Sequence, residues 1–180
     1  MERFEENSYS GAKLNFYRNL PKSAPKAIVH ISHGMAEHAG RYEWFMQTLM
    51  EAGYAVYAHD IRGHGYTYAS DSFKGHFSDK HGLDKLLHDL DFSIHLIKKN
   101  HPNVPIFCFG HSLGSILLLR YATSMYHRIN GIACWNSGIE TNTLAVVGKI
   151  ILSIERKFRS PRAESYFAWK LTFDAWGNKI

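Results

Sequence analysis

The residues with the clearest chemical potential lie in one short segment, Gly110–Gly114, which reads Gly-His-Ser-Leu-Gly. An apolar run of strand length, residues 104–109, precedes it, and apolar residues at helical spacing follow at once. A strand, a tight turn that carries serine and a helix, in that order, present a serine hydroxyl as a nucleophile. The same five-residue pattern occurs in ordinary turns, but the strand and the helix on either side of Ser112 favour the reactive arrangement.

The turn makes physical demands that explain its residue types. Ser112 must adopt a strained backbone conformation to lift its hydroxyl above the edge of a sheet. Gly110 and Gly114 flank it because side chains there would collide with the crossing strand and helix. The helix that follows directs its free N–H groups and the positive end of its dipole at an anion formed on the serine.

A serine hydroxyl is a poor nucleophile near neutral pH, so it needs further groups around it. It needs a base, usually histidine, and an acid that orients the base. It also needs main-chain N–H groups that bind the developing oxyanion. By position, we expect these amides from Leu113, which follows the serine, and from Met35, in the loop after an earlier strand.

The elements that must position these groups alternate along the chain. Two strands are expected within residues 2–20, and further apolar runs predict strands at 27–32, 54–59, 104–109 and 129–135. Helical spacing of apolar residues predicts helices over 42–49, 83–97 and 113–122, the last apolar nearly all round and so buried on several sides. This alternation predicts a parallel sheet with helices on both faces. The glycine-bearing loops that follow three of the strands should therefore meet at its carboxyl edge, at 33–38, 60–65 and 110–114.

Composition sets broad bounds on the class of protein. The chain has 180 residues, of which 45% are apolar and 21% charged, as in a soluble globular domain. The net charge of +5 comes without a dense Lys/Arg tract, so we expect no nucleic-acid partner. No run reaches the ~18 apolar residues of a membrane span, and the charged residues 1–6 lack the apolar core of a signal peptide. Cys108 and Cys134 lie in apolar runs, so we expect buried, reduced thiols and a cytoplasmic location.

Three motifs, in order, resemble the monoacylglycerol lipase and lysophospholipase group of α/β-hydrolases, the serine aminopeptidase S33 type. Residues 33–42 resemble its HG-x-x-EH-x-x-RY signature, 60–65 are similar to the loop after its next strand, and 110–114 match its serine turn. Together these motifs are far more specific than the turn alone. The resemblance covers residues 10–140 well and implies the α/β-hydrolase fold, with residues 1–138 as the N-terminal part of its core and 139–180 as the start of a cap.

The resemblance also implies roles for individual residues. Ser112 would be the nucleophile, Met35 and Leu113 would supply the oxyanion hole, and Gly110 and Gly114 would shape the turn. The loop that lines the substrate cleft would contain His33, Gly34, Glu37 and His38. The implied reaction is hydrolysis of a lipid-type carboxylic ester, a monoacylglycerol or a lysophospholipid, through an acyl-serine, with neither a metal nor an organic cofactor.

The sequence departs from the family pattern after the serine. Chain order in this fold is serine, acid, histidine, but the sole later histidine, His127, lies ~20 Å along the helix that begins at the serine. Asp174 has no strand before it. For His33, His38, His59 and His64 we favour roles as hydrogen-bonding groups in loops over a role as the base. We therefore expect a C-terminally truncated chain, inactive or nearly so alone, and poorly stable because a sheet edge is exposed.

Some alternatives stay open. The apolar stretch 144–154, followed by basic residues, is either a helix packed on the domain or a lid that covers an apolar substrate. The lid interpretation would bring peripheral membrane contact through residues 144–162. The chain could also be a non-catalytic α/β-hydrolase-like fragment that binds a lipid or a partner, or a thioesterase or peptidase on the same fold.

Overall fold

The computed structural model describes residues 1–137 throughout and, beyond them, residues 152–153, 155, 157–158, 160, 162–163 and 165–170. The chain divides into two compact units, Met1–Ser137 and Gly138–Ile180. The first unit contains the sheet and every predicted site residue, so the fold is described for it first.

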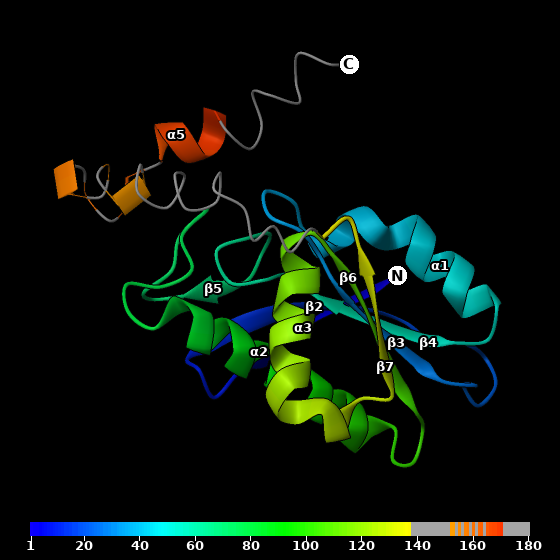
Figure 1. The fold of residues 1–180 in the computed structure, drawn as a ribbon. Coiled ribbons are helices and arrows are strands. Elements are labelled where there is room, and N and C mark those ends of the chain that lie inside the picture. The colour runs from blue at the N-terminus through cyan, green and yellow to red at the C-terminus, as the bar shows by residue number, and fades with distance from the viewer. Residues whose placement is uncertain are drawn as a thin grey trace. The chain divides into compact units, whose positions relative to one another are not determined.

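The sheet of the first unit is mixed, with a parallel centre and an antiparallel edge (Figure 1). Its strands are β1 (Glu2–Asn7), β2 (Ala12–Asn19), β3 (Ile28–Ser32), β4 (Ala55–His59), β5 (Tyr68–Ala69), β6 (Ile106–His111) and β7 (Gly131–Trp135). The order is β1-β2-β4-β3-β6-β7, with the short β5 paired to β2. Strands β4, β3, β6 and β7 are parallel to one another, whereas β2 runs antiparallel to β1, β4 and β5. The predicted α/β-hydrolase sheet is confirmed for this part of the chain.

Helices cover both faces of the sheet, as the alternating pattern predicts (Figure 1). The 3-10 turn η1 (Ala39–Tyr42) and helix α1 (Glu43–Glu51) pack on one face, where Met46 belongs to a buried cluster with Ile31 and Val56. Helices α2 (Gly82–Asn100) and α3 (Leu113–Met125), followed by the 3-10 turn η2 (Tyr126–Arg128), form the layer on the other face. The larger apolar core lies there, because both helices bury aliphatic side chains against β3 and β6.

The β7 side of the sheet corrects two expectations. Within residues 1–137, β7 pairs with β6 alone, and Cys134 is exposed rather than buried, whereas Cys108 in β6 is buried as predicted. Burial in apolar surroundings raises the pKa of the Cys108 thiol to about 12. Helix α3 is also less covered than its sequence indicates, since Ile116 is 51% exposed. An apolar run alone does not distinguish a central strand from an edge strand.

The second unit is described at fewer positions. Residues 152, 153, 155, 157 and 158 are helical, and α5 spans Tyr166–Trp169. The Tyr166 N–H donates to a carboxylate oxygen of Glu155 (3.0 Å). Most of the predicted lid segment 144–154 lies outside the described residues. Among the described residues, no helix combines the length and apolar character needed to cross a bilayer.

Candidate active site

The serine turn lies where β6 ends and α3 begins. Ser112 has φ 50° and ψ −113°, a conformation that is strained for a residue with a side chain. Its main-chain N–H donates to the carbonyl oxygen of Trp135 (2.9 Å), which ties the turn to the end of β7. The sharp bend predicted at residue 112 is therefore present in the backbone.

Both glycines of the turn lie where no side chain fits. A Cβ atom at Gly110 would lie 2.6 Å from the main-chain nitrogen of Ser115, in the first turn of α3. A Cβ atom at Gly114 would overlap the carbonyl oxygen of Ser32 at the end of β3. Helix α3 therefore packs directly on the strand beside its own, because Gly114 has no side chain.

A third small residue supports the turn, and the sequence analysis missed it. The buried Ser115 hydroxyl donates to the carbonyl oxygen of Gly110 (2.6 Å) and accepts from the N–H of Trp135 (3.2 Å). It thus joins the ends of β6 and β7 beneath the bend. The available sequence signal was a serine three residues after the nucleophile, on the buried side of an apolar helix.

Ser112 is half-buried, and its hydroxyl has no hydrogen-bond partner within the described part of the chain. As the first residue of α3, Leu113 has an N–H without an acceptor inside the helix. This N–H and the positive end of the helix dipole lie beside the serine. Within residues 1–137, the turn thus combines an unpaired hydroxyl with a free main-chain donor.

The loop after β3 lies against the serine turn. A Cβ atom at Gly34 would lie 2.9 Å from Nδ1 of His111, the residue before the serine. Met35 follows in a turn, with its side chain 45% exposed. Its N–H has no acceptor among the residues that the structure describes. The amides of Met35 and Leu113, which lack partners among the described residues, therefore lie in the loop after β3 and at the first residue of α3, on one edge of the sheet.

The predicted cleft histidines differ in exposure. His33 is fully buried, so its imidazole is not part of a cleft wall, whereas His38 is exposed. Nε2 of His33 accepts from the N–H of Ile61 (2.8 Å), and Nδ1–H donates to the carbonyl oxygen of Gly34 (2.7 Å). Burial lowers the pKa of His33 to about 4, so the ring is neutral at pH 7.

Two more histidines use their rings in the same structural way. Nε2 of His64 accepts from the N–H of Ala36 (3.3 Å) and thereby joins the loops after β3 and β4. His59 is buried in β4 and contacts the Ser93 hydroxyl through Nδ1 (3.0 Å). His127 lies in η2, beyond the far end of α3. The loop hydrogen-bonding roles favoured for His33 and His64 are thus observed, whereas His59 bonds from within β4 rather than from a loop.

A buried carboxylate, missed in the sequence analysis, holds the same loops. Asp60 accepts hydrogen bonds from the N–H groups of Ala39 and Tyr66 (both 2.9 Å) and from the Asn15 amide (2.8 Å). A Cβ atom at Gly65 would overlap this carboxylate, which explains the glycine there. Asp60 stands first in the motif 60–65, but its partners are too distant in sequence to be inferred.

Glu37 is the other carboxylate at this edge, and its side chain is 6% exposed. It accepts from Nδ1 of His111 (2.8 Å), the Tyr42 hydroxyl (2.9 Å) and the Gly34 N–H, and it pairs with Arg41 (2.8 Å). Burial alone would raise the pKa of Glu37, but these hydrogen bonds outweigh it and hold the pKa below its ordinary value. Glu37 is therefore an anion that bonds to its own loop and to the serine turn.

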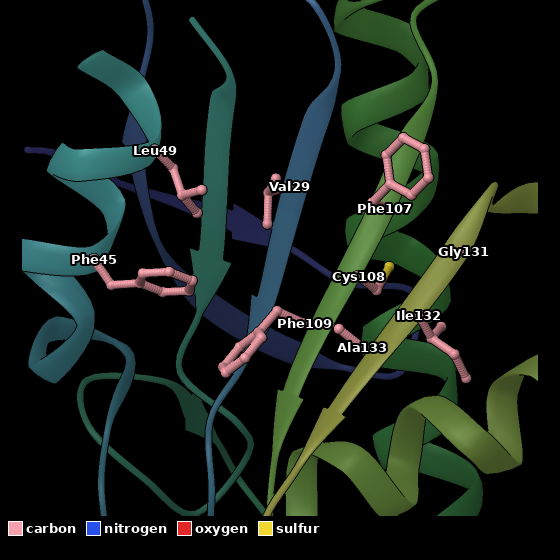
Figure 2. Close-up of a pocket in the computed structure, with 9 residues that line it drawn as sticks. All are labelled: Val29, Phe45, Leu49, Phe107, Cys108, Phe109, Gly131, Ile132 and Ala133. Carbon is pink, nitrogen blue, oxygen red and sulfur yellow. The ribbon is translucent and has the colours of Figure 1, made fainter. Parts of the chain in front are cut away.

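Described residues line two pockets beside the face of the sheet that α1 covers. Figure 2 shows the first, about 410 Å³, in which Phe45 and Leu49 of α1 extend toward Val29 and Phe109 on the strands. The second, about 610 Å³, lies at the carboxyl edge and is lined by both aromatic and charged side chains: Glu37, Arg41, Tyr42, Trp44, Phe45, Phe109, His111 and Trp135. Ser112 lines neither pocket.

This sheet order, with a strained serine between a parallel strand and a helix, defines an α/β-hydrolase. A carboxyl esterase from Bacillus coagulans superposes with a TM-score of 0.78 at 24% identity, over 94% of this chain and 55% of that chain, which supports the fold. The pattern that defines the family described as "Serine aminopeptidase, S33" matches residues 23–171, so the chain belongs to that family. The resemblance predicted from the three motifs is thereby confirmed.

Curated relatives match over a shorter stretch. A monoglyceride lipase from Rattus norvegicus is 33% identical over 112 residues, which are 62% of this chain and 35% of the relative. A monoacylglycerol lipase from Mycolicibacterium smegmatis is 36% identical over 119 residues, 64% of this chain and 40% of the relative. The match thus spans between a third and two fifths of the length of these relatives.

Proposed function

We propose that this chain carries the nucleophile and the oxyanion hole of a serine hydrolase that cleaves lipid-type carboxylic esters. The observation that carries the proposal is the backbone of Ser112, with φ 50° and ψ −113° at the junction of β6 and α3. Membership of the S33 family and the similarity to monoglyceride lipases support a monoacylglycerol or a lysophospholipid as the substrate.

In the proposed reaction, the Ser112 oxygen attacks the ester carbonyl carbon and its proton passes to a general base. The carbonyl oxygen becomes an oxyanion that accepts from the N–H groups of Met35 and Leu113. The alcohol then leaves with a proton, and water hydrolyses the acyl-serine to release the fatty acid. The imidazoles of His33, His64 and His111 contact other groups, so we assign the base to none of these three residues.

We assign residues 139–180 to the start of a cap over the acyl chain and residues 144–162 to peripheral membrane contact, in a cytoplasmic protein. The apolar run and the basic residues after it support this assignment. Neutralising the basic residues between 156 and 162 should weaken binding to anionic vesicles at low salt. Unchanged vesicle binding would contradict the membrane contact.

The test of the nucleophile compares Ser112→Ala with Ser124→Ala, the same change on the exposed side of α3, in the full natural protein. We expect a fluorophosphonate probe to label the wild type and Ser124→Ala at residue 112 but not to label Ser112→Ala. Monoacylglycerol hydrolysis should fall by about 10³-fold or more in Ser112→Ala. Hydrolysis by Ser112→Ala at the wild-type rate would refute the assignment.

A non-catalytic, lipid-binding role is the second candidate. It is favoured by one observation: the imidazoles of His33, His64 and His111 bond to other groups, so none of these three supplies a base to the Ser112 hydroxyl. This role predicts no probe labelling and unaltered lipid binding by Ser112→Ala. A panel of ester, thioester and peptide substrates separates a lipase from a thioesterase or a peptidase on the same fold.

A further inference from the structure

One oxygen atom of Glu37 bonds to both loops that carry the predicted oxyanion-hole amides. Oε1 accepts from the main-chain N–H of Gly34 and from Nδ1 of His111 (2.8 Å). Gly34 directly precedes Met35, and His111 is two residues before Leu113. The carboxylate therefore bridges two segments that are more than seventy residues apart in sequence.

The bridge begins from strands that already adjoin. Strands β3 and β6 are parallel neighbours, with Ser32 opposite Gly110 at their carboxyl ends. Beyond these residues the ladder stops, and each strand continues into its loop. Glu37 bonds to both loops just past the end of the ladder. It therefore links the two loops next to the amides that would bind an oxyanion.

The rest of the cluster fixes the orientation of Glu37. The Tyr42 hydroxyl donates to the same oxygen (2.9 Å), and Arg41 pairs with the other oxygen, Oε2 (2.8 Å). The carboxylate is 6% exposed, so water has little access to the acceptor side of these bonds, whereas the donor His111 is 30% exposed. Charge-assisted hydrogen bonds to a desolvated carboxylate are stronger than neutral ones.

We propose that Glu37 and His111 are positioning residues that fix the Met35 amide relative to the Leu113 amide. The inference rests on the proposed hydrolase function. The turn that holds Met35 is exposed and includes Ala36 at φ 60°, a conformation that is costly for alanine. An oxyanion hole works only when both donors are placed before the charge develops, and a misplacement of about 1 Å costs on the order of 10²-fold in rate.

The decisive variants change the donor at residue 111 while leaving Ser112 in place. His111→Leu removes the donor, whereas His111→Asn retains an N–H near the position of Nδ1. We expect kcat for monoacylglycerol hydrolysis to fall about 30- to 100-fold in His111→Leu, with KM within about threefold of the wild-type value. His111→Asn should restore kcat to within about fivefold of wild type.

Glu37→Gln tests the acceptor, because it preserves the shape of the side chain but removes its charge. We expect kcat to fall about tenfold. Glu2→Gln is the control: it makes the same change in an exposed carboxylate of β1, which pairs with Arg18, and should leave kcat unchanged. Thermal unfolding of each variant separates loss of fold from loss of rate.

A spectroscopic measurement completes the test on the full natural protein. The His111 Nδ1 proton should give a downfield, slowly exchanging NMR signal that moves upfield in Glu37→Gln, because an amide oxygen is a weaker acceptor than a carboxylate. If His111→Leu does not fold, the NMR signal and the kcat of Glu37→Gln still test the positioning role. Absence of the signal in the wild type, or wild-type kcat in folded His111→Leu or Glu37→Gln, would overturn the inference. These outcomes are distinct from wild-type activity in Ser112→Ala, which would refute the hydrolase function itself.

Discussion

The serine turn after β6 and the paired loops after β3 and β4 share one edge of the sheet but are held in different ways. The serine turn is shaped mainly by missing side chains, because Gly110 and Gly114 let the main chains of β6, α3 and β3 meet. The paired loops are held by buried polar side chains, chiefly those of His33 and Asp60, which bond to main-chain groups. Steric fit dominates in the first region and hydrogen bonding in the second.

The difference indicates how each region should respond to change. A close main-chain contact tolerates no added atom, so it should fail abruptly when a methyl group is introduced. A hydrogen-bonded loop loses stability in proportion to the groups left unpaired, and it responds to protonation. Three perturbations separate these behaviours.

The largest effect is expected from Gly114→Ala. The added methyl group would overlap the Ser32 carbonyl oxygen, so β3 and α3 would have to separate. We expect the free energy of unfolding to fall by about 4 kcal/mol or more, measured by urea denaturation. The control is Gly82→Ala at the start of α2, where the new Cβ lies 3.5 Å from Cβ of Phe77. Equal stabilities for the two variants would contradict the steric account.

A smaller loss is expected from Asp60→Ala in the paired loops. The change leaves the amides of Ala39, Tyr66 and Asn15 without their acceptor, and the bonds from Ala39 and Asn15 are buried. We expect a loss of about 3 kcal/mol in the free energy of unfolding, because each unpaired buried donor is costly. The exposed carboxylate Asp84 provides the control, since Asp84→Ala should cost less than about 1 kcal/mol. A loss for Asp60→Ala as small as that of the control would contradict this account, because it would mean that water accepts the hydrogen bonds in place of the carboxylate.

The smallest effect is a dependence of stability on pH. Because burial lowers the pKa of His33 to about 4, the unfolded chain binds a proton below its ordinary pKa of 6.5 and the folded chain does not. The stability contributed by neutral His33 is therefore complete above that value and is lost as the pH falls toward 4. We expect His33 to account for about 2 kcal/mol of loss between pH 7 and pH 5.

The pH prediction is checked by urea unfolding of His33→Gln and His38→Gln at both pH values. The His33 variant should show a smaller change with pH than the wild type. The His38 variant should match the wild type, because that side chain is exposed. If the wild type and both variants showed the same pH dependence of stability, His33 would not be the cause of that dependence.

The same contrast explains what the sequence could predict about the site. The serine turn was predictable because its glycines must lie at fixed spacing from Ser112, so the information is local. The roles of Asp60 and Ser115 were missed because their partners come from distant strands or the next loop. The burial of His33 was missed for the same reason, since its partner Ile61 follows a different strand.

Prediction of the fold met a similar limit. The helices and the central strands follow from apolar periodicity, and their observed bounds differ from the predicted ones by a few residues. The antiparallel place of β2 beside β4 and the two-residue strand β5 were not predicted, because pairing between distant strands leaves no local pattern. The exposure of Cys134 depends on the same missing information, namely which strands have two neighbours.

The place of β3 in the sheet has a consequence for how the chain is made. One of its neighbours is β4, and the other is β6, which begins at residue 106. A ribosome must add residues 33–105 before β6 can start, which takes on the order of ten seconds. Throughout that time the nascent chain carries an apolar strand with at least one side open, because β4, its other neighbour, is made first. We therefore expect chaperones to engage this chain early, and folding of the sheet to complete only after α3 has left the ribosome.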